Sequence, residues 1–131
     1  MNELRASKRV INEVAQEVRS LEEGVEWFSG LVTEEQQSVL HEIALYLMQA
    51  HVTVKDGRKG LEKSGVKATM TPAVLIVREP ILEQVGKIER LPQQEYLKAF
   101  RVLISTFAVA DTRRRETECQ GSCSHAWHNL S

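Results

Sequence analysis

Apolar residues recur along most of the chain at three- and four-residue spacing, the pattern of amphipathic helices. A first helix is predicted over residues 8–18. Its apolar face consists of Val10, Val14 and Val18, with Ile11 and Ala15 beside them. This spacing predicts that the helix packs one side against a core and leaves the other side in solvent.

Capping residues mark the next two helices. Ser20 precedes Glu23 by three residues, the spacing of a capping box, and Gly30 is expected to end this short helix. Its bulky apolar residues are Val25, Trp27, Phe28 and Leu31. Thr33 and Gln36 repeat the capping-box spacing and predict a helix that runs to about residue 51. The buried stripe expected for that helix is Leu40, Ala44, Leu47 and His51, thickened by Ile43.

The middle of the chain carries weaker helical signals. Residues 53–65 predict a polar helix that contains Gly57 and Gly60, although each glycine costs about 1 kcal/mol relative to alanine in a helix. Thr71 followed by Pro72 predicts a helix start. The apolar run 73–77 fits a buried strand or a buried helical turn, and helix is favoured because no partner strand is evident. Pro80 is expected to end or kink this piece before another helical segment over residues 81–88.

The clearest helix follows Pro92 and is predicted over residues 93–117. Its main stripe is Leu97, Phe100, Ile104 and Phe107, joined by Leu103 and Ala108. Apolar residues surround most of its middle, so we expect it to be the central helix. The predicted fold is all-α, a compact bundle of about five to six helices with a long central C-terminal helix. Residues 1–118 would form this domain, and a short Cys/His tail, 119–131, would pack on it.

Composition narrows the function classes. The 131 residues include 17 basic and 18 acidic side chains, which argues against a general nucleic-acid binder or an electrostatic membrane binder. The longest apolar stretches, 73–77 and 102–110, are far shorter than the roughly 20 residues that span a bilayer. Residues 1–9 show no apolar signal segment. We expect a cytoplasmic protein whose thiols stay reduced unless they serve metal or redox chemistry.

The most distinctive chemistry lies in the tail, where both cysteines of the chain and two of its four histidines fall within ten residues. These residues are Cys119, Cys123, His125 and His128. Two thiolates and two imidazoles are the ligand set of many tetrahedral structural zinc sites, although copper(I) also accepts these ligands. Zinc is therefore the predicted cofactor.

The tail set has open alternatives. Three tail ligands plus one from elsewhere would also suffice, and His51 is the outside candidate because it extends a predicted buried stripe. Asp111 falls on the apolar register of the last helix and would orient a ligating histidine. Three other interpretations compete with a metal site. The tail could be frayed, or the two cysteines could form a disulfide. One cysteine could also be a reactive thiol that Arg113, Arg114 and Arg115 activate.

Other catalytic signatures are absent from the sequence. His41 begins a stretch similar to the zinc-protease motif, but Leu45 occupies the position of the required second histidine, so that interpretation is rejected. No phosphate-binding glycine loop and no nucleophile-elbow motif occurs. Trp27 and Phe28 are interpreted as core residues rather than a ligand platform.

The chain resembles an uncharacterised bacterial family of small helical domains of unknown function with a C-terminal Cys/His tail. The resemblance rests on the stretches Ile11-Asn12-Glu13, Glu26-Trp27-Phe28, Gln49-Ala50-His51, Thr71-Pro72, Asp111 with Arg113-Arg114-Arg115, and Cys119 through His128. It implies a bacterial, single-domain, helical protein and brings no activity, substrate or partner with it.

Three functions are compatible with these features. The leading hypothesis is a non-catalytic module that binds another protein and has a structural metal in its tail. The second is a zinc-dependent enzyme with an open metal position, and the third is a cysteine-based redox sensor.

Overall fold

The computed structural model describes the backbone of residues 2–67, 71–78 and 86–130, and the side chains of residues 7–67, 71–78 and 86–116. The helices are α1 (Asn2–Ala15), α2 (Leu21–Ser29), α3 (Thr33–Gln49), α4 (Val54–Ser64), α5 (Pro72–Arg78) and α7 (Tyr96–Leu130), with a 3₁₀ turn, η1 (Gln93–Glu95), before α7. The described backbone contains no strand, which confirms the all-α prediction.

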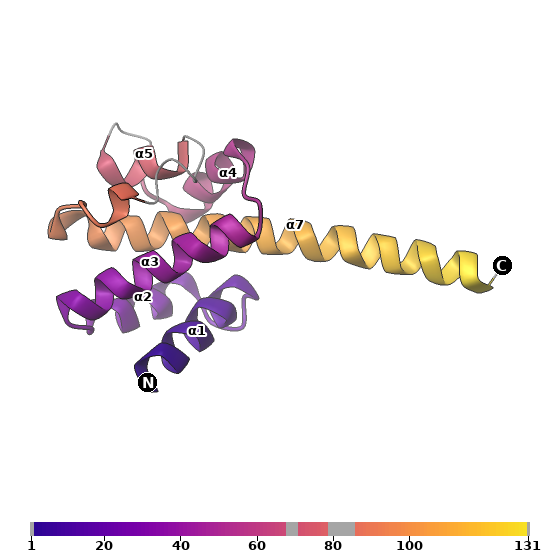
Figure 1. Ribbon diagram of the computed structural model, residues 1–131, viewed down its shortest axis with the longest axis horizontal. Helices are drawn as coiled ribbons and strands as arrows, with labels where there is room; N and C mark the ends of the chain where they lie inside the picture. The colour runs from indigo at the N-terminus through magenta and orange to yellow at the C-terminus, as the bar shows by residue number, and fades with distance from the viewer. Residues whose placement is uncertain (1, 68–70, 79–85, 131) are drawn as a thin grey trace.

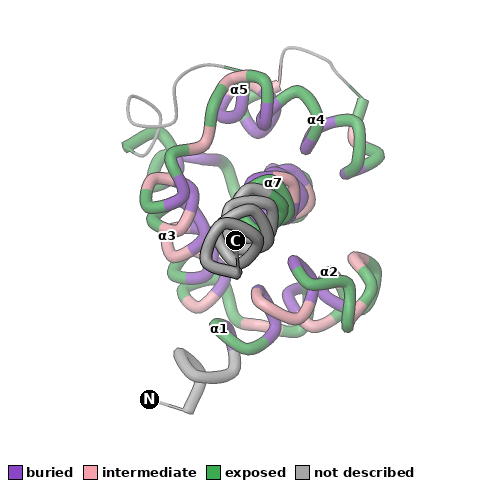
Figure 2. Tube along the Cα trace, turned by 90° about the vertical axis from the view of Figure 1, so that its right-hand side faces the viewer, coloured by how far each residue is buried: buried purple, intermediate pink, exposed green. Residues whose placement is uncertain are grey.

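Helix α7 is the axis of the bundle. Figures 1 and 2 show α1 to α5 arranged around it, and every one of these helices contacts it. Its middle is buried on all sides, with Phe100, Leu103 and Ile104 fully enclosed. The predicted central helix is therefore confirmed, although Leu97 of the predicted stripe is 44% exposed. The backbone of α7 runs on to Leu130, past the predicted end near residue 117 (Figure 1).

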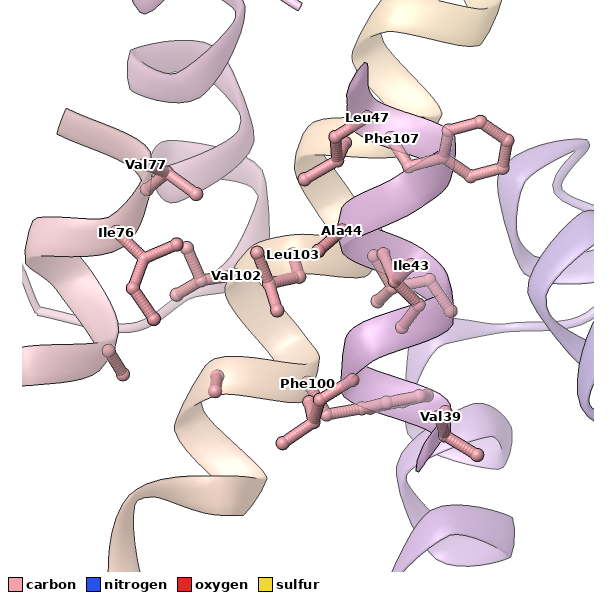
Figure 3. Packing of buried hydrophobic residues seen from close by; sticks show 14 of the residues in the cluster. Val39, Ile43, Ala44, Leu47, Ile76, Val77, Phe100, Val102, Leu103 and Phe107 are labelled. Carbon is pink, nitrogen blue, oxygen red and sulfur yellow. The ribbon is translucent and has the colours of Figure 1, made fainter. Parts of the chain in front are cut away.

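Helix α3 meets α7 with large apolar side chains. Leu40, Ile43 and Leu47 are fully buried, and Figure 3 shows Ile43 and Leu47 beside α7. The ring of Phe100 also stacks on Phe28 of α2, with ring centroids 4.4 Å apart. Burial of each such side chain contributes about 1.5–3 kcal/mol. These contacts make the core that the apolar spacing predicted.

Helix α4 meets its neighbours with glycines instead. A Cβ atom added at Gly57 would lie 2.0 Å from the carbonyl oxygen of Val77 in α5. One added at Gly60 would lie 2.4 Å from the Cα of Thr106 in α7. The predicted polar helix is confirmed, and its glycines are the points where the backbones approach closely.

Three predicted helix boundaries can be compared with the structure. Ser20 and Glu23 form the predicted capping box of α2, and Gly30 is its C-cap. Thr33 is wrong as an N-cap, because Val32 takes that position and Thr33 is already helical. The Gln36 side chain instead donates a 3.0 Å hydrogen bond to the backbone carbonyl of Phe28, so it joins α2 to α3.

Val18 is wrong as a core residue. Helix α1 ends at Ala15, and Glu17 adopts a left-handed φ of 62°. The chain therefore leaves the helical register before Val18, which is 72% exposed. The other four residues of the predicted face, Val10, Ile11, Val14 and Ala15, are buried.

The apolar run 73–77 belongs to α5, so helix was the right choice over strand. Ala73 and Val74 are fully buried against the core. Pro80 and most of the predicted segment 81–88 lie outside the described residues, but residues 86–88 are helical and Ile88 is fully buried. None of the described helices is long and apolar enough to cross a membrane.

Candidate functional site

The predicted metal ligands of the tail lie on the last part of α7. The backbone of this part is helical, but the side chains of Cys119, Cys123, His125 and His128 are outside the described residues. The tail site therefore stays a prediction, as does its packing on the bundle. The described residues closest to it in sequence are 111–116, and their contacts can be compared with the roles predicted for them.

Asp111 is buried at 8% exposure, as its apolar register predicted. Its carboxylate accepts a 3.1 Å hydrogen bond from Arg114 and two further bonds from Arg115, both on the following turn of α7. The two oxygens therefore already receive three charge-assisted hydrogen bonds. The role of Asp111 in orienting a histidine stays a prediction, and its contacts within the described part of the chain are to arginines.

Asp56 forms the connection between this part of α7 and α4. Arg113 donates two hydrogen bonds to its carboxylate, at 3.2 and 2.9 Å. The backbone amide of Thr53 donates a third at 3.1 Å, which completes a capping box at the start of α4. Asp56 is 3% exposed, so one buried carboxylate both caps its own helix and holds α7.

Burial acts on the pKa of Asp56 in the opposite direction to its partners. Burial alone would raise the pKa, because it disfavours the charged form. The hydrogen bonds from Arg113 and Thr53, together with the charge of Arg113, outweigh this effect and lower the pKa below its ordinary value. Asp56 therefore stays ionised in the folded protein. The capping-box spacing from Thr53 to Asp56 is the one signal by which the sequence could have identified this residue, and nothing in the sequence indicates its partner on α7.

The arginine run of α7 is therefore paired with carboxylates. Arg113 contacts Asp56, while Arg114 and Arg115 contact Asp111. All three guanidinium groups remain about half exposed. Two aspartates face these three guanidinium groups, so most of the positive charge is neutralised locally, which reduces the field that the arginines would exert on a nearby thiol.

His51 does not continue the buried stripe of α3. The helix ends at Gln49 with Ala50 as its C-cap, and His51 turns away with a left-handed φ of 52°. Its side chain is exposed. The expectation that His51 is buried is wrong for this reason, while its role as a metal ligand stays a prediction.

His41 lies in a surface groove of about 680 Å³ along α3. Its Nδ1 is buried, has no hydrogen-bond partner among the described residues, and lies 3.9 Å from a carboxylate oxygen of Glu89. Leu45, at the position where the zinc-protease motif requires a second histidine, also lines this groove. Nowhere in the described side chains do three or more histidine, cysteine, aspartate or glutamate residues form a group that could hold a metal ion.

The chain matches the family model described as "Family of unknown function (DUF5958)" over residues 6–130. The chain belongs to the DUF5958 family. This confirms the resemblance to an uncharacterised family of small domains. No curated protein and no solved structure matches this DUF5958 chain.

Proposed function

We propose that this DUF5958 chain is a non-catalytic helical module that binds another protein and holds a structural metal ion, expected to be zinc, in its C-terminal tail. The observation that carries the proposal is the ligand set of the tail, Cys119, Cys123, His125 and His128, within ten residues. Thiolate and imidazole ligands favour zinc in a closed tetrahedral site.

The surroundings of Asp111 support a structural site over a catalytic one. In a zinc enzyme with an open position, a nearby carboxylate would act as the base that takes a proton from the bound water. Asp111 is the nearest described carboxylate that is buried, and two arginines already bind it. Its two oxygens accept three hydrogen bonds from these arginines, which leaves little acceptor capacity for a metal-bound water.

The arginine pairs also disfavour the redox-sensor alternative. A reactive thiol needs a positive environment that stabilises its thiolate. Arg113, Arg114 and Arg115 would be the source of that charge, and each is paired with an aspartate. A bound metal ion would stabilise the thiolates without help from these arginines.

The path of α7 suggests what the metal would do. The helix passes through the centre of the bundle and carries the tail at its far end. A structural zinc ion adds its binding free energy to folding. On an unbroken helix the two cysteines share one side and the two histidines lie on the other, because each residue turns the helix by about 100°. In this proposal the tail therefore leaves the helical path of α7 so that the four ligands can surround the metal, and the tail fixed in this way forms part of the surface that the partner protein recognises.

A competition titration with a chromophoric zinc chelator tests the metal site. We expect one zinc ion per chain, and Cys123→Ser should weaken zinc affinity by a factor of at least about 100, because the ion loses a thiolate ligand. His41→Ala is the matched control, since His41 lies on α3 beside Glu89, and it should bind zinc like the unchanged chain. Equal affinity in Cys123→Ser and the unchanged chain would overturn the proposal.

Three further measurements separate the alternatives. X-ray absorption should show four protein ligands around zinc, whereas a bound water would favour the enzyme. His51→Ala should weaken zinc affinity only if His51 completes the ligand set. Thiol titration of the metal-free chain should give ordinary pKa values for both cysteines, and a strongly lowered value would favour the redox sensor.

A further inference from the structure

A second surface groove lies between α2 and α4 and has a volume of about 770 Å³. Figure 2 shows these two helices on either side of α7. The residues that line it come from the start of α2, the end of α4 and the segment after it, and the first turns of α7. Its size falls within the range of small-molecule sites, roughly 300–1,000 Å³.

Basic side chains predominate in the lining of this groove, although the charge of the whole chain is nearly balanced. Four basic side chains line it, Lys63, Lys67, Lys98 and Arg101, against one acidic side chain, Glu22. They form two pairs that are close in sequence, Lys63 with Lys67 and Lys98 with Arg101, and the fold brings the two pairs together. The C-terminal end of α4, at Ser64, also lines the groove and carries the partial negative charge of the helix dipole. The four basic side chains carry more charge than this partial charge. Such a convergence raises the local concentration of anions.

The Arg101 side chain is held in one orientation by an ion pair. Its guanidinium forms a two-bond pair with Glu22, at 2.8 and 2.7 Å. The hydrogen bond from Arg101 lowers the pKa of Glu22, so the pair stays ionised. A guanidinium has five N–H donors, and this pair uses two of them. The remaining donors are held in a defined position by the pair.

The lysines can exchange their present partners at little cost. Lys63 pairs with Glu17 at 3.1 Å, and Lys98 lies 3.7 Å from Glu95. Neither glutamate lines the groove. Both lysines are about half exposed, and surface ion pairs of this kind contribute only about 0–1 kcal/mol. A ligand with several negative oxygens can therefore compete for them.

The floor of the groove adds an apolar surface. Leu21 and Val66 line it, and both are partly buried side chains packed against the core. We propose that this groove binds a phosphorylated small molecule, with its phosphate on the basic side chains and its organic part on Leu21 and Val66. This site is independent of the metal in the tail.

A titration with inorganic pyrophosphate at constant ionic strength tests the site, followed through the backbone amide signals of ¹⁵N-labelled protein. We expect saturable shifts at Gly65 and Lys67. Lys67→Gln should weaken binding about tenfold, since a charge-assisted hydrogen bond is lost, and Lys67→Arg should retain most of the affinity. Lys55→Gln is the matched control, because Lys55 is an exposed lysine in the first turn of α4 and does not line the groove.

Three results would overturn the proposal. One is a response that does not saturate, another is equal affinity in Lys67→Gln and the unchanged chain, and the third is an equal loss in Lys55→Gln and Lys67→Gln. Flotation with phosphatidylglycerol vesicles identifies the source of the phosphate. Vesicle binding that requires Lys67 would support a lipid headgroup, and pyrophosphate binding without vesicle binding would support a free small molecule.

Discussion

Helices α3 and α4 both pack along α7, but with opposite kinds of residue. Helix α3 inserts large side chains such as Ile43 and Leu47, both fully buried. Helix α4 has little apolar side-chain material and places Gly60 directly against the backbone of Thr106. One interface is stabilised by burial of apolar surface, and the other by close approach of two backbones.

The difference shows what glycine does in a helix of this bundle. Counted by helix propensity alone, Gly57 and Gly60 weaken α4 by about 1 kcal/mol each. In the structure a side chain at either position would collide with a neighbouring helix. The loss in propensity is offset by contacts that no larger residue would permit.

The largest expected effect comes from the α3 interface. Leu47→Ala should lower the free energy of unfolding by about 3–4 kcal/mol, because it leaves a cavity in a fully buried site. Leu45→Ala on the same helix is the control, since Leu45 is 41% exposed, and it should cost less than about 1 kcal/mol. Urea denaturation measures both. Equal effects would contradict the buried packing of α3 on α7.

At the interface of α4 with α7, close packing and helix propensity predict opposite changes in stability for one substitution. Gly60→Ala should destabilise the protein by about 2–3 kcal/mol, because the added Cβ would lie 2.2 Å from the Thr106 Oγ1 and 2.4 Å from its Cα. Helix propensity alone predicts the reverse, a gain of about 1 kcal/mol.

Gly30→Ala is the control for this substitution. Gly30 has φ −81°, and a Cβ there would come no closer than 3.5 Å to the carbonyl oxygen of Trp27. Alanine should therefore be neutral or slightly stabilising at this position. If thermal unfolding shows Gly60→Ala to be as stable as Gly30→Ala, the close approach of α4 to α7 is wrong.

A smaller loss of stability is expected when the ion pair between Asp56 of α4 and Arg113 of α7 is weakened. Asp56→Asn should cost about 1–2 kcal/mol at neutral pH, because it weakens the hydrogen bonds to Arg113 and Thr53. The folded pKa of Asp56 is lowered, so its contribution is fully present above the unfolded pKa of about 3.9. That contribution is lost as the pH falls through the folded pKa.

The stability difference between the unchanged chain and Asp56→Asn should therefore shrink below about pH 4. Urea denaturation at neutral and acidic pH measures this difference. A gap that is the same at both pH values would show that the carboxylate charge does not stabilise the contact of α4 with α7.

The fold was predictable wherever large apolar residues recur at helical spacing. The stripe of α3 from Leu40 to Leu47 and the central position of α7 followed from that pattern. The failures came from local backbone conformation. Val18 and His51 fit their stripes by spacing, but a left-handed residue ends the helical register, at Glu17 in the first case and at His51 itself in the second.

The candidate site was predictable only in part. Its ligand set is inferred from residue types that lie close together in the sequence, and it stays a prediction. The register of Asp111 correctly predicted burial, but its pairing with Arg114 and Arg115 had no sequence signal. The Asp56–Arg113 pair joins positions 57 residues apart, and such a pair appears only when α4 is placed against α7.

Metal content is the most direct test of the proposed function. Native mass spectrometry of the purified chain should show one zinc ion per chain, bound through the tail that contains Cys119 and His128. Removal of the ion with a chelator should lower the Tm, because metal binding adds to folding free energy. A metal-free chain whose Tm is unchanged by the chelator would contradict the proposed function.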